Sequence, residues 1–392
     1  MTDLAERKTR LLHPRTRAAQ QSAGGRRSVF LLVIVAMLLT IGLGAMLSAS
    51  SVVSLKADDG QFELFTKQVM WVGLGLAALV VTSLVPYRIW QKYAFPLFVA
   101  TLTGLIVTVA IGSARGGATR WIVLGPITLQ VAEFAKFTTL SLLAAVLTKK
   151  DALLGDIRHV LFPVGAILGS VTFLLLTQPD FGNVLLIVCP AFVMLFASKV
   201  PLRFVFGLGV LGALAMSAMA MSADYRKDRL LGFLDPFADA RNTGLQAVQS
   251  MVALGTGGLF GVGLGQSRAR WSWLPNAHTD FIFAIIGEET GFAGATIVIT
   301  LFALLAVVGV SIAYRAPDMY GRLLAIGIVS WLTLQAIVNI GGVVAVLPIT
   351  GVPLPFISSG GNAMLVNLAA IGVLVNITRS SRASRRVETG SV

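Results

Sequence analysis

The residues best suited to chemistry lie between Pro275 and Glu289, where a polar segment meets a hydrophobic one. This stretch holds three carboxylates, among them Asp280 and Glu288, and one of the three histidines of the chain, His278. An ionisable group at the boundary of a long apolar segment is costly, so it marks a candidate functional site. Asp is also a favourable helix N-cap, which is the structural alternative for Asp280. Because a cap explains neither the glutamates nor the histidine, the pattern favours a functional carboxylate.

Long apolar segments must position these residues. Of 392 residues, 56% are hydrophobic and 12% are charged, whereas about a quarter of the residues in soluble proteins are charged. Apolar runs fall at about 29–52, 68–86, 93–112, 130–148, 160–177, 183–198, 204–221, 290–313, 323–344 and 362–378. Runs of this length suit membrane-spanning helices, and the short alternating segments of a membrane barrel are absent. The sequence therefore predicts an all-α polytopic membrane protein with about ten transmembrane helices.

The positive charges indicate the topology. Residues 1–28 carry seven Lys and Arg, and residues 379–392 carry four more. Basic clusters beside membrane spans mark the cytoplasmic side and lie near anionic lipid. We therefore expect two basic cytoplasmic tails, 1–28 (disordered, and not a signal peptide) and 379–392, around a transmembrane domain at 29–378. The net charge of +13 then indicates contact with membrane lipids rather than with nucleic acid. In this topology, residues 222–279 are expected to form one large extracytoplasmic loop between helices 7 and 8.

Two ionisable positions lie within or beside the apolar runs. Glu133 and Lys136 are three residues apart, share a face of the fourth helix and are expected to neutralise each other. The pair is either a structural ion pair or part of a cavity wall. Asp180 follows a proline and could cap the sixth helix or act chemically; the cap is the preferred interpretation. The single cysteine, Cys189, lies in an apolar run, and the histidines lack the spacing of a zinc site.

The loop at 222–279 combines positive charge, glycine and aromatic residues. It opens with a charged run that includes Arg226, Lys227 and Arg229, for which a solvated face is the alternative. Apolar residues at 245, 248, 251 and 252 predict a short amphipathic helix on the bilayer surface. Six glycines between 255 and 265 permit close backbone approach and leave amide N–H groups free to face an anion. With Arg268 and Arg270 beside two tryptophans, this part suits a phosphate-bearing lipid, and a flexible linker is the alternative.

The last outer segment, at 346–362, is apolar and holds three prolines within eight residues. Irregular backbone at membrane depth is tolerated only where it is buried in protein or lines a cavity. We therefore expect this segment, which includes Ser358 and Ser359, to form a wall of the site.

These segments together resemble the SEDS family, the FtsW/RodA-type peptidoglycan glycosyltransferases, over about 30–378 of the chain. The resemblance rests on five motifs in the family's order: Gly-Ala-Thr-Arg-Trp at 117–121, Glu-Phe-Ala-Lys at 133–136, Gln-Pro-Asp-Phe-Gly at 178–182, His-Thr-Asp-Phe-Ile-Phe-Ala at 278–284 and Pro-Leu-Pro-Phe-Ile-Ser at 353–358. Segments 261–267 and 284–289 are more similar to the cell-division branch, FtsW, than to the elongation branch, RodA. Two departures from the family pattern, at 130–133 and 359–362, affect fine contacts rather than the function.

The resemblance implies polymerisation of lipid II on the outer face of the bacterial cytoplasmic membrane, at the division septum. A glycan passes from an undecaprenyl diphosphate donor to the 4-hydroxyl of an acceptor sugar, with inversion at the anomeric carbon. The family's essential acid maps onto Asp280, which is assigned as the general base for that hydroxyl. The leaving diphosphate needs positive charge. The candidates for this charge are Arg120, Arg226, Lys227, Arg229, Arg268 and Arg270. The resemblance also implies a divalent cation (Mg or Mn) and no organic cofactor.

Further residues are candidates for binding the substrate or supporting Asp280. Glu288 is expected to support it, because positions eight apart share a helix face. The candidates for substrate binding are Arg120, Glu133, Lys136, Asp180, Arg226, Lys227, Arg229, Arg268, Arg270, His278, Thr279, Glu288, Ser358 and Ser359.

The resemblance also implies a class B penicillin-binding protein as partner, bound at the outer faces of helices 8 and 9. Other divisome proteins are implied too, with the N-terminal tail as their candidate contact. Two different functions stay open: a lipid II transporter, suggested by Glu133, Lys136 and the proline-broken helices, and a non-catalytic divisome scaffold. Acids and glycines on the outer side argue against the transporter, and a scaffold leaves the Asp280 cluster unexplained.

Overall fold

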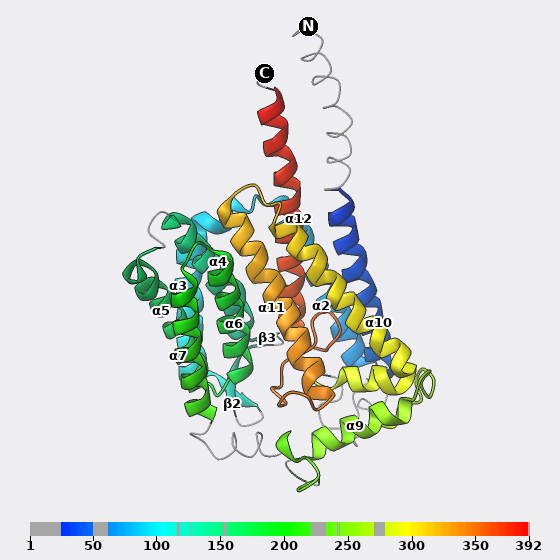
Figure 1. Cartoon of the computed structure of the whole chain (residues 1–392). Coiled ribbons are helices and arrows are strands. Elements are labelled where there is room, and N and C mark those ends of the chain that lie inside the picture. Colours follow the sequence, from blue (N-terminus) through cyan, green and yellow to red (C-terminus); the bar gives the residue numbers. More distant parts are fainter. Residues whose placement is uncertain are drawn as a thin grey trace.

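Helices make up most of the regular structure of the chain (Figure 1). The computed structural model describes residues 25–49, 62–115, 118–125, 127–151, 155–220, 233–240, 242, 244–269 and 279–390. Its helices are the N-terminal helix Gly25–Ala49, α2 (Glu63–Leu84), α3 (Arg88–Ile111), α4 (Val131–Lys149), α5 (Ile157–Thr177), α6 (Phe181–Ala197), α7 (Leu202–Ala220), α9 (Leu245–Gly257), α10 (Ile282–Ala313), α11 (Met319–Val343) and α12 (Gly361–Gly390). The predicted all-α class is confirmed.

The long helices match the predicted apolar runs. Within the described residues, eight helices are long and apolar enough to cross a membrane: the N-terminal helix, α2, α3, α4, α5, α10, α11 and α12. The sixth and seventh predicted runs correspond to two shorter apolar helices, α6 and the part of α7 at Leu202–Gly212. The chain is therefore a multi-pass membrane protein.

Burial divides the bundle into a centre and a rim. In α4, α11 and α12, 72%, 67% and 83% of the most apolar stretch is buried, whereas the share is 22% in α2 and 28% in α3 and α5. Large apolar side chains on the rim, such as Phe95, Phe162 and Phe206, are exposed. Extended apolar surface of this kind is what a lipid environment requires. The central helices, by contrast, can carry polar groups because protein surrounds them.

A small antiparallel sheet between α3 and α4 was not predicted. β1 (Ser113–Arg115) pairs with β2 (Ala118–Leu124), which pairs with β3 (Ile127–Leu129). Gly125 turns the chain between β2 and β3 in the left-handed conformation, with a φ of 63°. Two of the strands have three residues each, too short to show the alternation that identifies a strand in a sequence. The sheet matters because β2 carries Arg120.

α10 differs from the predicted eighth helix in its start and its shape. It begins at Ile282 rather than near 290, and it is bent at Gly291, where φ is 69°. The glutamates at 288 and 289 interrupt the apolar pattern without interrupting the helical backbone, so the apolar run marks only the part after the bend. The short helix predicted inside the large loop is confirmed as α9.

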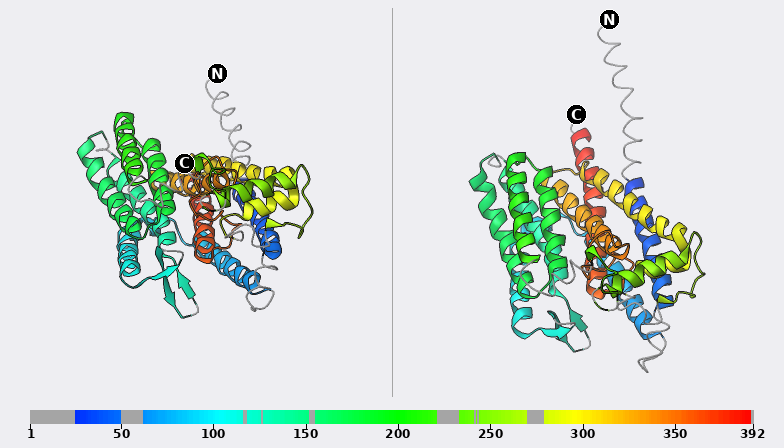
Figure 2. Two further views of the ribbon diagram at one scale, coloured as in Figure 1. Left: turned by 90° about the horizontal axis from the view of Figure 1, so that it is seen from below. Right: turned by 60° about the horizontal axis from the view of Figure 1, so that its bottom comes forward.

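The two ends of the bundle are formed by different segments of the chain. The start of the N-terminal helix and the end of α12 lie at the same end of the molecule (Figure 1). α9 and the β2–β3 hairpin lie at the opposite end, as the second set of views also shows (Figure 2). This arrangement agrees with the predicted topology, in which both termini share a side; that this side is cytoplasmic stays a prediction. The segments that carry the candidate residues begin α4, α6, α10 and α12, and therefore lie opposite the termini.

Candidate functional site

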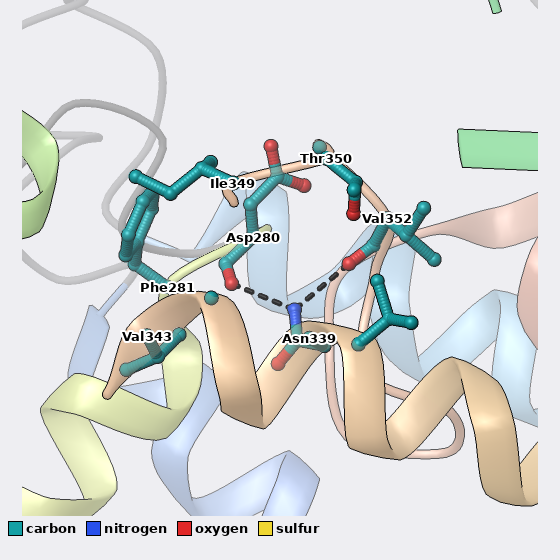
Figure 3. Close-up of a pocket in the computed structure, with 10 residues that line it drawn as sticks. Asp280, Phe281, Asn339, Val343, Ile349, Thr350 and Val352 are labelled. Atoms are coloured by element: carbon teal, nitrogen blue, oxygen red, sulfur yellow. Dashed lines mark hydrogen bonds between the residues drawn. The ribbon is translucent and has the colours of Figure 1, made fainter. Parts of the chain in front are cut away.

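Asp280 lies in the turn that precedes α10. The N-cap of α10 is Phe281, and no side chain makes a cap hydrogen bond there, so the interpretation of Asp280 as the N-cap is wrong. The backbone carbonyl of Asp280 accepts a hydrogen bond of 2.8 Å from Asn339 Nδ2. In Figure 3 the Asp280 carboxylate points away from Asn339. Asn339 of α11 therefore holds the backbone of Asp280, while the carboxylate extends away from that helix.

Two amide side chains of α11 hold the loop that faces Asp280. Asn339 Nδ2 also donates to the carbonyl of Val352 at 2.8 Å, so one buried amide ties two segments together (Figure 3). One turn earlier, Gln335 Nε2 donates to the carbonyl of Pro353 at 2.8 Å. Between them and Asp280, Gly351 has a φ of 71°, and a Cβ at this position would stand 3.6 Å from Asp280 Oδ2. Most of residues 352–358 of this irregular loop are buried, and Gly351, Val352 and Pro353 line the site.

Asp280 opens into a polar pocket of about 320 Å³ at the end of the bundle opposite the termini. The pocket is built from β2, the starts of α4, α6 and α12, and the turns before α10 and α12. Six predicted site residues line it: Arg120, Glu133, Asp180, Thr279, Asp280 and Ser359. The other lining residues are Trp121, Gln130, Asn183, Gly351, Val352, Pro353, Gly360, Asn362 and Ala363. Segments more than two hundred residues apart in the sequence therefore meet around one cavity.

Glu133 and Lys136 form the predicted ion pair, with Lys136 Nζ 2.8 Å from Glu133 Oε2 and side chains that are 0% and 2% exposed. The ammonium group also lies 3.3 Å from Gln335 Oε1 and 5.1 Å from the centre of the Trp331 ring. A carboxylate, an amide oxygen and an aromatic ring together stabilise an ammonium group that is buried away from water. Glu133 lines the pocket and Lys136 lies behind it, so the pair is a structural ion pair with one member at the cavity wall.

Asp180 is the N-cap of α6, as preferred from the sequence. Its carboxylate accepts from Asn183 N at 3.4 Å and from Asn183 Nδ2 at 2.9 Å. Arg120 reaches the preceding turn, where its guanidinium donates to the carbonyls of Gln178, at 3.4 Å, and of Pro179. These contacts fix one cation and one anion at the pocket wall, and they connect the sheet to the α5–α6 turn.

Ser358 is not a pocket residue. Its hydroxyl accepts from the Leu354 amide at 2.8 Å and its side chain is buried, so it stabilises the loop before α12. Ser359, the next residue, does line the pocket. Asn362 connects the start of α12 to the sheet, because its Nδ2 donates to the carbonyl of Thr128 at 2.8 Å.

Glu288 does not line the Asp280 pocket. Its buried carboxylate accepts from Ser267 Oγ at 2.5 Å and from the amides of Arg268 and Ala269 at 3.0 and 3.1 Å. The expectation that Glu288 shares a helix face with Asp280 is wrong, because Asp280 precedes the helix and helical spacing does not apply to it. Glu288 instead holds the loop at 267–269, and Arg268 lines a second pocket of about 410 Å³ beside α9.

The glycine-rich segment makes the predicted close backbone approach, and several of its amides are already paired within the protein. Gly261, Val262 and Gly263 donate their N–H groups to carbonyls of α9 and α10, at 2.7, 3.0 and 3.1 Å. A Cβ at Gly261 would stand 2.1 Å from the carbonyl oxygen of Glu289. Gly261, like Gly257, is therefore required by backbone packing against α10. The amides of Gly261, Val262 and Gly263 are paired within the protein and are not free to face an anion.

Comparison with known proteins agrees with this fold and with the sequence motifs. The sequence model of the FtsW, RodA and SpoVE proteins, described as "Cell cycle protein", matches residues 29–383. The chain belongs to this family. The SEDS resemblance is thereby confirmed, and residues 29–383 include every segment that builds the pocket.

Named relatives of the family cover almost the whole chain. Stage V sporulation protein E of Bacillus subtilis is 37% identical over 90% of this chain and 97% of its own length. A probable peptidoglycan glycosyltransferase FtsW of Coxiella burnetii is 40% identical over 87% of this chain and 93% of its own length. A corresponding protein of Geobacter metallireducens is 37% identical over 90% and 95%. The chain thus matches, over most of its length, relatives of which two are named as probable peptidoglycan glycosyltransferases.

Solved structures of the family share the fold. A chain from a structure described as "Structural coordination of polymerization and crosslinking by a peptidoglycan synthase complex" is 29% identical, with a TM-score of 0.74 over 90% of this chain and 97% of that chain. The rod-shape-determining protein RodA of Thermus thermophilus is 28% identical, with a TM-score of 0.66 over 89% and 96%.

Some predicted residues of this SEDS family member lie outside the described part of the chain. They are Arg226, Lys227, Arg229, Arg270 and His278, and their assignment to the substrate stays a prediction. Among the described residues, no group of three or more His, Cys, Asp or Glu side chains is arranged to hold a metal ion. No protein ligands can therefore be named for the divalent cation that the family resemblance implies.

Sequence reasoning missed the amide side chains of the site. Asn183, Asn339 and Asn362 lie at the pocket or directly beneath Asp280, and Gln335 supports the loop. A signal was present, since Asn339 and Gln335 interrupt an apolar run and are four residues apart on one helix face. Polar residues within a membrane helix usually face the protein interior, where they find partners.

Proposed function

We propose that this chain polymerises lipid II into β-1,4 glycan strands on the outer face of the bacterial cytoplasmic membrane. The observation that supports this most directly is the Asp280 carboxylate in a polar pocket of about 320 Å³, at the end of the bundle opposite the termini. The names of the FtsW relatives support a peptidoglycan glycosyltransferase. A pocket at the membrane surface suits a substrate with a sugar head and a lipid tail, because the tail can stay in the bilayer.

The chemistry follows from a single displacement. The 4-hydroxyl of the acceptor sugar attacks the anomeric carbon of the donor and forms the new C–O bond. The bond from that carbon to the diphosphate breaks, and the electron pair leaves with undecaprenyl diphosphate. Asp280 accepts the proton of the attacking hydroxyl, which requires an approach of about 3 Å or one bridging water. One carboxylate suffices, because one displacement inverts an α-linked donor into a β-linked product.

Charge and hydrogen bonding in the pocket support these roles. The guanidinium of Arg120 lines the pocket and can offset negative charge that develops on the diphosphate. The charge of Glu133 is neutralised by Lys136, so it does not cancel the positive charge of Arg120. Amide side chains such as Gln130 can donate to and accept from sugar hydroxyls. The basic residues beyond the described chain stay additional candidates, as does a divalent cation.

The partner and the cellular site extend the proposal. A class B penicillin-binding protein would crosslink the new strands, and the outer faces of α10 and α11 are the candidate contact. Exposed apolar side chains there include Val307 of α10 and Ile337 of α11. The similarity to relatives named FtsW supports a role at the division septum with other divisome proteins.

The test is polymerisation of purified lipid II by the chain in phospholipid vesicles, with and without a cognate transpeptidase. Asp280→Asn should lower the rate by at least about 10²-fold, because general bases contribute this much or more. Asp156→Asn is the matched control: Asp156 caps α5 at the other end of the bundle, its side chain is 51% exposed, and Asn caps equally well.

Each outcome of this assay has one meaning. Strands from wild type and Asp156→Asn but not from Asp280→Asn support the proposal. Equal rates for the wild type, Asp280→Asn and Asp156→Asn would overturn the assignment of Asp280 as general base. Silence of all three with the transpeptidase present, combined with translocation of a fluorescent lipid II across the vesicle, would favour the transporter.

A further inference from the structure

The turn that follows α9 exposes large apolar side chains at the edge of the molecule. Leu259, Phe260 and Leu264 are 68%, 85% and 80% exposed. Residues 242–267 contain no Asp, Glu, Lys or Arg. The segment at 258–265, called the glycine turn below, lies beside α9 and the first part of α10 (Figure 1). An uncharged surface with three exposed large apolar residues is unfavourable in water and marks an interaction site.

Backbone hydrogen bonds attach the glycine turn to the bend in α10. At Gly291 the helical hydrogen bonds are interrupted. The N–H groups that follow the bend, of Phe292 and Ala293, donate to the carbonyls of Gly258 and Leu259 at 2.9 and 3.1 Å. The carbonyls that precede the bend accept from the turn in the same way, at 3.0 and 3.1 Å. Pairing of this kind is what irregular backbone at membrane depth requires.

The length of α10 places the turn at the edge of the hydrocarbon layer. From Phe292 to Ala313 the helix is about 33 Å long at 1.5 Å per residue, which matches a hydrocarbon core of about 30 Å. The far end of this segment is marked by Tyr314, which is exposed, and by Arg315, both typical of a membrane–water boundary. The bend at Gly291, with the glycine turn bound to it, therefore lies at the opposite boundary.

The exposed surface of the turn is continuous with the lipid-facing side of α10. Phe292, directly after the bend, is 67% exposed, and Ile297 is 55% exposed. On the other side of the turn, Val252 of α9 is 55% exposed. Arg268 ends the uncharged stretch, where a guanidinium can reach the headgroups. This gradient from apolar to basic residues fits a phospholipid leaflet.

We propose that the glycine turn is a membrane anchor that inserts Leu259, Phe260 and Leu264 into the outer leaflet of the phospholipid bilayer. Because the turn is hydrogen-bonded to α10 on both sides of its bend, insertion sets the depth of the bend. Asp280 lies two residues before α10. The depth of the bend therefore also determines the height of Asp280 above the bilayer. The anchor does not depend on the reaction proposed for the pocket.

The experiment uses the single cysteine of the chain. Cys189→Ala removes it, and Phe260→Cys and Leu264→Cys then provide two separate sites for a nitroxide label. In vesicles of phosphatidylethanolamine and phosphatidylglycerol, with no partner protein, electron paramagnetic resonance compares collisions with oxygen, which concentrates in lipid, and with a water-soluble nickel chelate. Ile297→Cys is the lipid-facing reference and Asp156→Cys the aqueous one. Monodisperse elution of each labelled variant shows that it is folded.

If the turn is inserted, labels at positions 260 and 264 should have the same ratio of oxygen to nickel collisions as the label at position 297. This ratio should be much higher than that of the label at position 156. A ratio equal to that at 156 would place the turn in water and overturn the anchor. Low collision rates with both reagents would mean that protein covers the turn, such as a second copy of the chain, and would also overturn it. Polymerisation activity plays no part in this readout, so a wrong proposal for the pocket leaves the result interpretable.

Discussion

Removal of Lys136 tests the structural account of the site most directly. Lys136→Met keeps the length and apolar body of the side chain but removes the ammonium group that pairs with Glu133 at 2.8 Å. Both side chains are almost fully buried, and Lys136 lies behind the pocket wall, so the position of its ammonium group is closed to water. Gln335 also loses a donor to its Oε1 atom, although the Trp331 indole still donates to it at 2.9 Å.

The expected cost follows from the geometry. Opposite charges 2.8 Å apart attract by about 6 kcal/mol at an effective dielectric constant of 20, and most of this offsets the desolvation of the two groups. Breaking a buried pair by removing one partner typically costs about 3–5 kcal/mol, because the remaining charge stays buried. Lys136→Met should therefore lower the free energy of unfolding by about 3–5 kcal/mol. Adding Glu133→Gln removes the stranded charge and should recover most of the loss.

The assay is reversible unfolding in mixed micelles of a mild detergent and dodecyl sulfate, for both single variants and the double variant. The control is Lys67→Met, which breaks the exposed ion pair with Glu63 on α2. Exposed helical pairs contribute about 0.3–0.5 kcal/mol, so this variant should be almost unchanged. A loss below about 1 kcal/mol for Lys136→Met, or a double variant less stable than both single ones, would refute the reasoning, because neither fits a stranded buried charge.

Two further predictions concern the support of Asp280 and of the bend in α10. Asn339→Leu leaves the carbonyls of Asp280 and Val352 without their donor and lets Asp280 shift. As a result, kcat should fall about 10²-fold with a smaller change in KM. An unchanged kcat in the lipid II assay would contradict a positioning role for Asn339. Gly261→Ala places a Cβ 2.1 Å from a carbonyl of α10 at a φ of +81° and should destabilise the protein by at least about 2 kcal/mol. Gly255→Ala, where a Cβ meets nothing within 4 Å, is its control and should be neutral or stabilising in the same unfolding experiment.

Much of the fold could be predicted from local pattern. The apolar runs located the helices, because hydrocarbon thickness sets a minimum length that a sequence reveals directly. The three-stranded sheet escaped prediction because its strands are too short to show a period. The start of α10 escaped because buried polar groups such as Glu288 break a hydropathy pattern while the backbone stays helical.

The site was predicted unevenly for the same reason. Asp280, Glu133 and Arg120 stood out because charge is rare in this chain, and all three line the pocket. Ser358 was misplaced because it adjoins the pocket residue Ser359 while its own side chain binds the surrounding loop. Glu288 was misplaced because Asp280 precedes the helix, so helical spacing does not relate the two, and its carboxylate binds the loop at 267–269. Local spacing identifies a residue type and its segment, but not the direction in which the side chain points.

The sequence by itself determined the environment of this protein and the small set of groups able to do chemistry within it. Hydropathy and charge are properties of single residues, and summing them along the chain is enough to identify membrane spans. Only the tertiary structure decided that Asp280, Arg120 and Glu133 share one pocket, and that Asn339 holds Asp280 beneath it. These contacts join segments far apart in the chain, and they depend on the rotation and packing of each helix against the others, which no local pattern records.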